Sequence, residues 1–185
     1  MTRIPKSYQN LGEFVAYLEK RGQLRRIRTP VSTELEITEI TDRVSKNPSW
    51  NYALLFENVR GYDIPVLINA FGSAQRMAWS LGMESLEHLR QRIASLVKPE
   101  FPHGVLETFS KLGELSEAVR YRPKKVESGP CQDIVFKDAE INLTRLPILT
   151  CWPHDGGPYI TLPMVITRDP KSGARNVGMY RLQVY

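Results

Sequence analysis

The spacing of apolar residues predicts several helices in the first half of the chain. Apolar residues that recur every three or four positions form one face of an amphipathic helix. The clearest stripe predicts a helix that Ser7 caps and Gly22 stops. Further stripes predict helices over residues 37–47, 73–82, 86–97 and 105–121.

Short apolar runs predict the strands. In the first half, residues 23–29 are expected to form a short strand, and residues 53–56 and 65–69 two buried strands joined by a turn-rich segment. After Cys131, apolar runs separated by proline and glycine predict strands at 134–136, 146–149, 159–167 and 176–184. The last two flank a turn-rich loop, so we expect them to form a hairpin.

Together these patterns predict an α+β fold with two domains. Residues 1–121 are expected to form an amino-terminal α/β domain, and the polar, proline-bounded residues 122–131 a linker. Residues 132–185 are expected to begin a β-rich domain. A hairpin that stops at Tyr185 would leave a strand edge without a partner, so we expect this second domain to be incomplete.

Composition narrows the classes of function. Hydrophobic residues make up 42% of the chain and charged residues 24%, which is ordinary for a globular protein. The net charge of +5 comes from small basic groups without interleaved aromatics, which favours an anionic small molecule over nucleic acid. The sequence shows no signal peptide, no run that could span a bilayer, and no cysteine spacing typical of zinc sites. We therefore expect a cytoplasmic protein with reduced thiols.

The last predicted strand carries two polar residues that packing does not explain. Asn176 and Arg181 lie in an otherwise apolar run, and an unbroken strand would point them to opposite faces. Gly178 between them permits a bulge or bend that could turn both toward one ligand. The alternative is an edge strand whose two polar side chains are solvated.

The loop before the predicted hairpin combines Cys151, His154 and Asp155 with two glycines. A nucleophilic cysteine needs a base held beside it, and this spacing does not ensure one, so we interpret Cys151 as a structural thiol. The glycine pair could bring backbone N–H groups to a phosphate, or it could form a plain turn.

Four ordered blocks carry a resemblance to a known family. They are Glu34-Leu-Glu-Ile-Thr-Glu-Ile, Ala53-Leu-Leu-Phe-Glu-Asn, Pro147-Ile-Leu-Thr-Cys-Trp-Pro and Asn176-Val-Gly-Met-Tyr-Arg. Over essentially its whole length the chain resembles the amino-terminal part of the UbiD-type decarboxylases. The resemblance implies that residues 132–185 begin a split-barrel, flavin-binding domain.

The resemblance also implies an activity and a site. The family decarboxylates aromatic and α,β-unsaturated acids reversibly and without oxidation, using prenylated FMN, a divalent metal that is usually Mn²⁺, and often K⁺. It implies that Asn176 is a metal ligand near the cofactor phosphate. It further implies that Met179, Tyr180 and Arg181 line the flavin site, with Arg181 as the catalytic candidate between the cofactor and the substrate carboxylate. Oxygen ligands suit Mn²⁺, and the arginine fork suits a carboxylate.

Other parts of the family's site come from later segments. The resemblance implies that a histidine and a glutamate complete the metal site, and that acidic residues supply the proton, all beyond the equivalent of Tyr185. Arg181 is therefore expected to lack an acid partner, and the isolated chain to be inactive. The alternative is a noncatalytic accessory or binding module, or one subunit of a split decarboxylase.

The family also suggests substrates and partners. A 4-hydroxy-3-polyprenylbenzoate of quinone biosynthesis is the leading expectation, while menaquinone-pathway and xenobiotic aromatic acids stay open. The expected partners are a flavin prenyltransferase that supplies the cofactor and further copies of the complete chain in a homo-oligomer. A polyprenylated substrate would bring the protein to a membrane surface.

Overall fold

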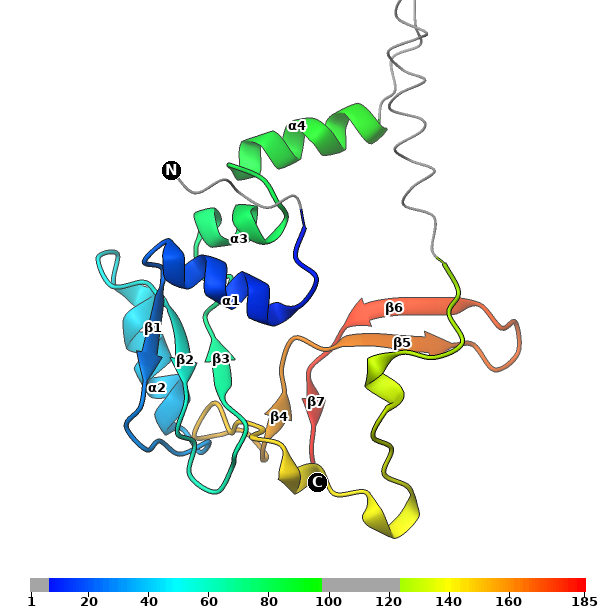
Figure 1. Ribbon diagram of the computed structural model, residues 1–185. Coiled ribbons are helices and arrows are strands. Elements are labelled where there is room, and N and C mark those ends of the chain that lie inside the picture. The colour runs from blue at the N-terminus through cyan, green and yellow to red at the C-terminus, as the bar shows by residue number, and fades with distance from the viewer. Residues whose placement is uncertain (1–6, 98–123) are drawn as a thin grey trace, which may run out of the picture. The chain divides into compact units, whose positions relative to one another are not determined.

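The computed structural model describes residues 7–97 and 124–185 (Figure 1). The described residues fall into two compact units. One comprises those up to Leu86 together with Asn142–Tyr185, and the other those between Glu87 and Ile141. The second unit holds most of α4 (Leu86–Val97) and two short 3-10 turns, η1 (Pro130–Gln132) and η2 (Asp138–Glu140). The mixture of helices and strands confirms the predicted α+β class.

A three-stranded sheet forms the centre of the first unit, in the order β1-β2-β3. β1 (Leu24–Ile27) runs parallel to β2 (Ala53–Phe56), and β3 (Val66–Ile68) runs antiparallel to β2. A parallel pair needs a crossover connection, and α2 (Glu36–Lys46) lies in it. Every residue of β2 is buried, which explains why this strand is a continuous apolar run rather than an alternating one.

Two apolar clusters pack against the sheet, and successive residues of β2 alternate between them. The first cluster joins β2 to α1 (Leu11–Lys20) and contains Phe14, Leu18, Leu24, Ala53, Leu55 and Ala70. The second joins β2 to α2 and contains Val31, Ile37, Leu54, Phe56, Val59 and Leu149. Leu149 shows that a late segment of the chain completes the core of the first unit.

The start of α1 differs from the prediction. Asn10, not Ser7, caps this helix, and its side chain accepts a hydrogen bond from the Glu13 N–H at 3.0 Å. Asn10 directly precedes the first helical residue, whereas Ser7 lies too far upstream to reach the free N–H groups of the first turn. Gly22, with a φ of 66°, follows the helix as predicted.

The other helices agree with the apolar stripes. α3 (Ala74–Ser80) starts after Ser73, whose hydroxyl accepts a hydrogen bond from the Arg76 N–H at 3.2 Å. The bounds of α4 match the predicted 86–97. The helix predicted over 105–121 lies outside the described residues. Among the residues that are described, none of the helices has both the length and the apolar character to cross a membrane.

Arg76 ties the sheet together at one end. Its side chain is wholly buried. Nη1 donates to Gln23 Oε1 at 3.2 Å and to the Asn51 carbonyl at 2.6 Å, and Nη2 donates to Asn51 Oδ1 at 2.8 Å and to the Asn69 carbonyl at 3.2 Å. Gln23 precedes β1, Asn51 precedes β2 and Asn69 follows β3. Because β3 runs antiparallel to the other two, one guanidinium links all three strands at the same end of the sheet.

The segment before the hairpin packs onto the start of α2. The Thr150 N–H donates to the Thr33 carbonyl at 3.1 Å, and the Leu35 N–H donates to the Thr150 carbonyl at 2.9 Å. The Thr38 hydroxyl donates to the Cys151 carbonyl at 2.9 Å. These bonds place Asn142–Tyr185 in the first compact unit. The domain boundaries predicted at 121 and 131 stay predictions, since residues 98–123 lie outside the described part of the chain.

The predicted hairpin forms, but each of its two strands is broken once. β5 (Met164–Arg168) pairs with β6 (Arg175–Met179), and β4 (Tyr159–Ile160) pairs with β7 (Leu182–Gln183), both antiparallel. Between the two pairings, residues 161–163 oppose only residues 180–181, so the first strand carries one extra residue. Leu162 has a φ of 59° at this bulge, and Pro163 brings no N–H to pair.

Two predicted strands do not form among the described residues. Residues 134–136 lie between η1 and η2, and the side chains of Ile134, Val135 and Phe136 are exposed. Residues 146–149 make only an isolated bridge, from Leu149 to Tyr159. A short apolar run becomes a strand only where a neighbour supplies the ladder of hydrogen bonds, and the described residues supply none here.

Candidate functional site

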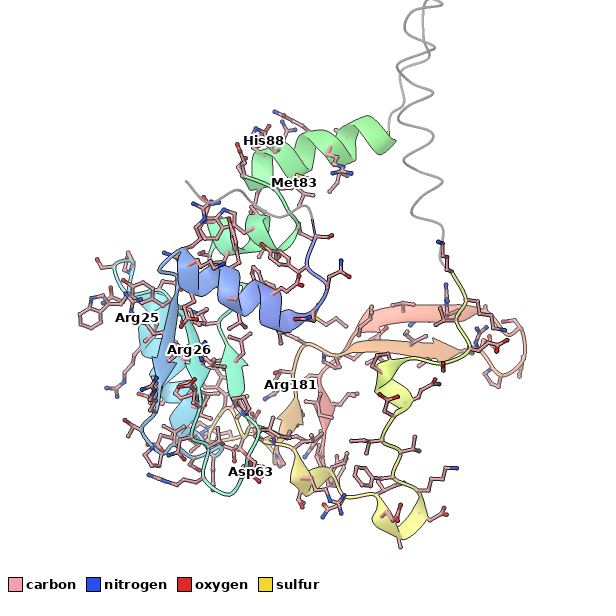
Figure 2. The ribbon with its side chains drawn as sticks, viewed as in Figure 1. Arg25, Arg26, Asp63, Met83, His88 and Arg181 are labelled. Carbon is pink, nitrogen blue, oxygen red and sulfur yellow. The ribbon has the colours of Figure 1, made fainter. Side chains whose placement is uncertain are left out.

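Arg181 lies at the break between β6 and β7 and forms a two-pronged ion pair. Its Nη1 donates to Asp155 Oδ1 at 3.0 Å and its Nη2 to Asp155 Oδ2 at 2.5 Å. The Arg181 Cζ lies 3.8 Å from the centre of the Tyr159 ring, and Figure 2 shows Arg181 beside β4. The parallel hydrogen bonds and the ring fix the guanidinium in one orientation.

Asp155 is itself anchored by a tight turn. Its N–H donates to the Trp152 carbonyl at 3.0 Å, and its Oδ2 accepts from the Trp152 N–H at 3.1 Å. The hydrogen bonds from Arg181 are the main reason that the pKa of the Asp155 carboxyl is lowered, and Asp155 in turn raises the pKa of Arg181. Both groups are therefore charged at neutral pH.

A second contact supports the same region. The Tyr159 hydroxyl donates to Gln183 Oε1 at 3.1 Å, across the β4–β7 pair. A Cβ atom at Gly156 would come within 2.7 Å of Gln183 Nε2, so a side chain there would displace the amide that holds Tyr159. Gly156 therefore has a packing reason, and Gly157, with a φ of 148°, has a backbone reason.

Asn176 and Tyr180 share one face of β6, with Gly178 between them. Asn176 Nδ2 donates to the Tyr180 hydroxyl at 3.4 Å. A Cβ atom at Gly178 would lie 2.4 Å from Tyr180 Cε2, so only glycine lets the ring fold back over the strand. The predicted bulge or bend does not lie at Gly178, because Gly178 pairs with Val165 within the regular β5–β6 ladder. The chain departs from the ladder at Tyr180 and Arg181 instead.

Met179 lies on the opposite face of β6. Alternation along the strand groups it with Val177, and the strand register places Met164 and Ile166 directly across from these two residues. All four side chains are more than half exposed. The predicted site residues thus form three groups: Asn176 with Tyr180, Arg181 with Asp155, and Met179 on an apolar face.

Sequence reasoning missed Asp155. It predicted that Arg181 would have no acid partner within the chain, and the ion pair shows that this is wrong. The two residues are 26 positions apart, and neither carries a local pattern that points to the other. The register of the hairpin contained the signal, because pairing Tyr159 with Gln183 brings the loop before β4 beside the residue before β7.

Cys151 behaves as a structural residue. It is half-buried and packs against the second apolar cluster. His154, three positions along, is exposed. The thiol lies near Arg181 and helps to raise the pKa of that guanidinium, but the described residues give it no base.

The described residues fit a divalent metal only in part. Asn176 has an exposed amide oxygen, which is a suitable donor for Mn²⁺. Within residues 7–97 and 124–185, however, no group of three or more His, Cys, Asp or Glu side chains could hold a metal ion. Asn176 is therefore a candidate for one ligand of a site whose other ligands are not among these residues.

Two family models match the chain. Residues 15–96 match the 3-octaprenyl-4-hydroxybenzoate carboxy-lyase N-terminal domain, and residues 124–185 match the Rift-related domain of the same carboxy-lyase. An uncharacterized protein of Aquifex aeolicus is 52% identical over 177 residues, which cover 96% of this chain and 36% of that protein.

Solved structures give the same result. The UbiD-class enzyme HmfF from Pelotomaculum thermopropionicum, in complex with FMN, is 30% identical with a TM-score of 0.69, covering 94% of this chain and 34% of that one. Vanillic acid decarboxylase from Sedimentibacter hydroxybenzoicus, in its open form, is 30% identical with a TM-score of 0.72, covering 97% and 35%. The chain spans about a third of the length of these relatives. Since both domain models and the solved structures agree, the chain belongs to the UbiD family of carboxy-lyases.

Proposed function

We propose that the complete protein is a reversible, non-oxidative decarboxylase of an aromatic or α,β-unsaturated carboxylic acid. It uses prenylated FMN and a divalent metal, for which Mn²⁺ is the first candidate. K⁺ is a candidate for an additional ion. The observation that carries the proposal is the oriented, partly exposed guanidinium of Arg181 at the β6–β7 break of a UbiD-family chain. A 4-hydroxy-3-polyprenylbenzoate of quinone biosynthesis is the first substrate to test.

Each predicted residue has a distinct proposed role. Arg181 binds the substrate carboxylate, because a planar fork of N–H donors matches two carboxylate oxygens. Met179 and Tyr180 directly precede it in the sequence and contribute to the walls of the flavin site. Asn176 supplies an amide oxygen to the metal. Bound prenylated FMN supplies the electron sink that loss of CO₂ requires.

Asn176→Ala is expected to lower the metal and flavin content of the complete protein by on the order of tenfold or more, because loss of one ligand weakens the metal site. Metal per protein by mass spectrometry and flavin by absorbance, both after gel filtration, measure this. Ser172→Ala, in the exposed loop of the same hairpin, is the matched control and should retain both. Equal retention of metal and flavin by the Asn176 variant and the parent would contradict the assignment.

The 185-residue chain alone, supplied with prenylated FMN and Mn²⁺, is expected to release no CO₂ from aromatic acids. The reason is that Asn176 has no co-ligand cluster among the described residues. Headspace CO₂ from the purified chain, compared with the complete protein at equal concentration, measures this. Release at a comparable rate would show that the chain holds a whole active site.

A noncatalytic module or one subunit of a split decarboxylase is the second candidate. The observation behind it is the exposed apolar face of Met164, Ile166, Val177 and Met179 on the hairpin, which a separate partner chain would cover. Intact mass of the protein from its native gene separates the cases. A species much larger than 21.2 kDa supports a conventional enzyme, whereas a 21.2 kDa species with a stoichiometric partner supports a split one.

A further inference from the structure

We propose that Asp155 is a positioning residue for Arg181: it holds the guanidinium so that the N–H groups it leaves free face the carboxylate of the substrate. This inference rests on the proposed function, in which Arg181 binds that carboxylate. It adds a residue from a different loop, 26 positions earlier in the chain, to the set on which the reaction depends.

Both partners of the Asp155–Arg181 ion pair are held by further contacts. Asp155 has a side chain that is only 12% exposed, and the Trp152 N–H holds its Oδ2. Arg181 is held in turn by the Tyr159 ring, whose centre lies 3.8 Å from its Cζ. An ordinary surface ion pair has two mobile partners and contributes little. Here the Asp155 carboxylate is held by the Trp152 backbone independently of Arg181.

The ion pair leaves part of the Arg181 guanidinium free to donate. A guanidinium carries five N–H groups. Asp155 takes one from each terminal nitrogen, and the Cys151 thiol interacts with the same guanidinium. The Arg181 side chain remains 40% exposed. Asp155 thus fixes the plane of the fork without occupying it fully, which leaves N–H groups for a second oxyanion.

The contrary possibility is that Asp155 competes with the substrate for Arg181. Removing the acid would then leave a bare cation and strengthen the binding of a carboxylate. The Arg181 side chain is 40% exposed, so water and salt screen its charge in part. Without Asp155 the Tyr159 ring and the Cys151 thiol still contact the guanidinium, but the orientation set by the two parallel hydrogen bonds is lost. We therefore expect orientation to outweigh the loss of the opposing charge.

The test is a double-mutant cycle on the flavin-loaded complete protein, with benzoate as the probe. Calorimetry gives the Kd for benzoate in the parent, Asp155→Asn, Arg181→Ala and the double variant. Asp155→Asn is expected to weaken binding on the order of tenfold while the flavin absorbance stays unchanged. In the Arg181→Ala background the same change should have no further effect, because Asp155 acts through Arg181.

Asp169→Asn is the matched control. Asp169 also accepts backbone hydrogen bonds in a turn, from Lys171 and Ser172, so the substitution repeats the chemistry in the hairpin loop. It should leave the Kd at the parent value. Asp155→Glu keeps the charge but lengthens the side chain, and it should restore less than full affinity if geometry is what matters.

The outcomes separate cleanly. Unchanged or tighter benzoate binding by Asp155→Asn, or an equal loss in the parent and Arg181→Ala backgrounds, overturns the positioning role and leaves the proposed function intact. A parent protein that holds flavin and shows the expected coupling supports it. A parent that binds neither flavin nor benzoate overturns the proposed function, and this inference with it.

Discussion

Arg181→Ala is expected to lower the turnover of the flavin-loaded complete enzyme by on the order of 10²–10³-fold. In the proposed site the guanidinium orients the carboxylate that leaves as CO₂, and misplacing a reacting group by about 1 Å can cost about 10²-fold. Flavin content should fall much less, since the proposal assigns cofactor retention to Asn176 and the metal. Steady-state CO₂ release and flavin absorbance on the same preparations measure the two effects.

Two further variants sharpen this prediction. Arg181→Lys keeps the charge but replaces the planar fork by a point charge, so it should recover only part of the lost turnover. Arg168→Ala removes an exposed arginine from the same hairpin, bonded only to the Gly173 carbonyl among the described residues, and should leave turnover unchanged. Near-parent turnover in Arg181→Ala would remove Arg181 from the catalytic site.

Arg76→Ala is expected to reduce the free energy of unfolding by about 2–4 kcal/mol, because it removes a wholly buried side chain from a hydrogen-bond network. The Gln23 side chain and the Asn51 carbonyl would lose the donor they have in this network. Asn51 Oδ1 and the Asn69 carbonyl would keep a second donor, from the Asn69 side chain and the Gly72 N–H. A buried acceptor without a partner costs about 1–3 kcal/mol. The same change would also leave a cavity at the edge of the sheet.

Equilibrium urea unfolding, followed by far-UV circular dichroism, measures the Arg76 effect. Arg76→Lys should lose less stability than Arg76→Ala, because an ammonium still offers three donors. It should not match the parent, because a single nitrogen cannot reach the acceptors on both sides of the network. Arg43→Ala is the control: Arg43 is exposed on α2, where its pair with Glu39 is worth about 0.3–0.5 kcal/mol. A loss below about 1 kcal/mol in Arg76→Ala would show that the network contributes little net stability.

The sequence predicted the helices and the central strand because each carries its own local pattern. The stripe of α1 follows the helical period, and Ala53–Phe56 is apolar throughout because β2 is covered on both faces. The start of α1 was harder to predict, because Ser7 and Asn10 are both residue types that cap helices well. Only the position of the first helical turn decides between them.

Long-range pairing explains what the sequence could not predict. The apolar run at 134–136 lacks a neighbouring strand among the described residues, and no local pattern reveals that. The bulge at 161–163 depends on the register of two strands. The Asp155–Arg181 pair depends on that register too, so an acidic residue in a glycine-rich turn gave no sign of its partner. Family resemblance pointed to Arg181, but the contact that holds it came from the fold.

The mass of the bound cofactor shows whether the complete protein uses prenylated FMN. The complete protein would be purified after co-expression with a flavin prenyltransferase, denatured, and its released small molecules measured by mass spectrometry. We expect prenylated FMN at close to one equivalent per chain in the parent, and a much smaller amount in Asn176→Ala. A parent protein that is free of any flavin after this treatment would contradict it.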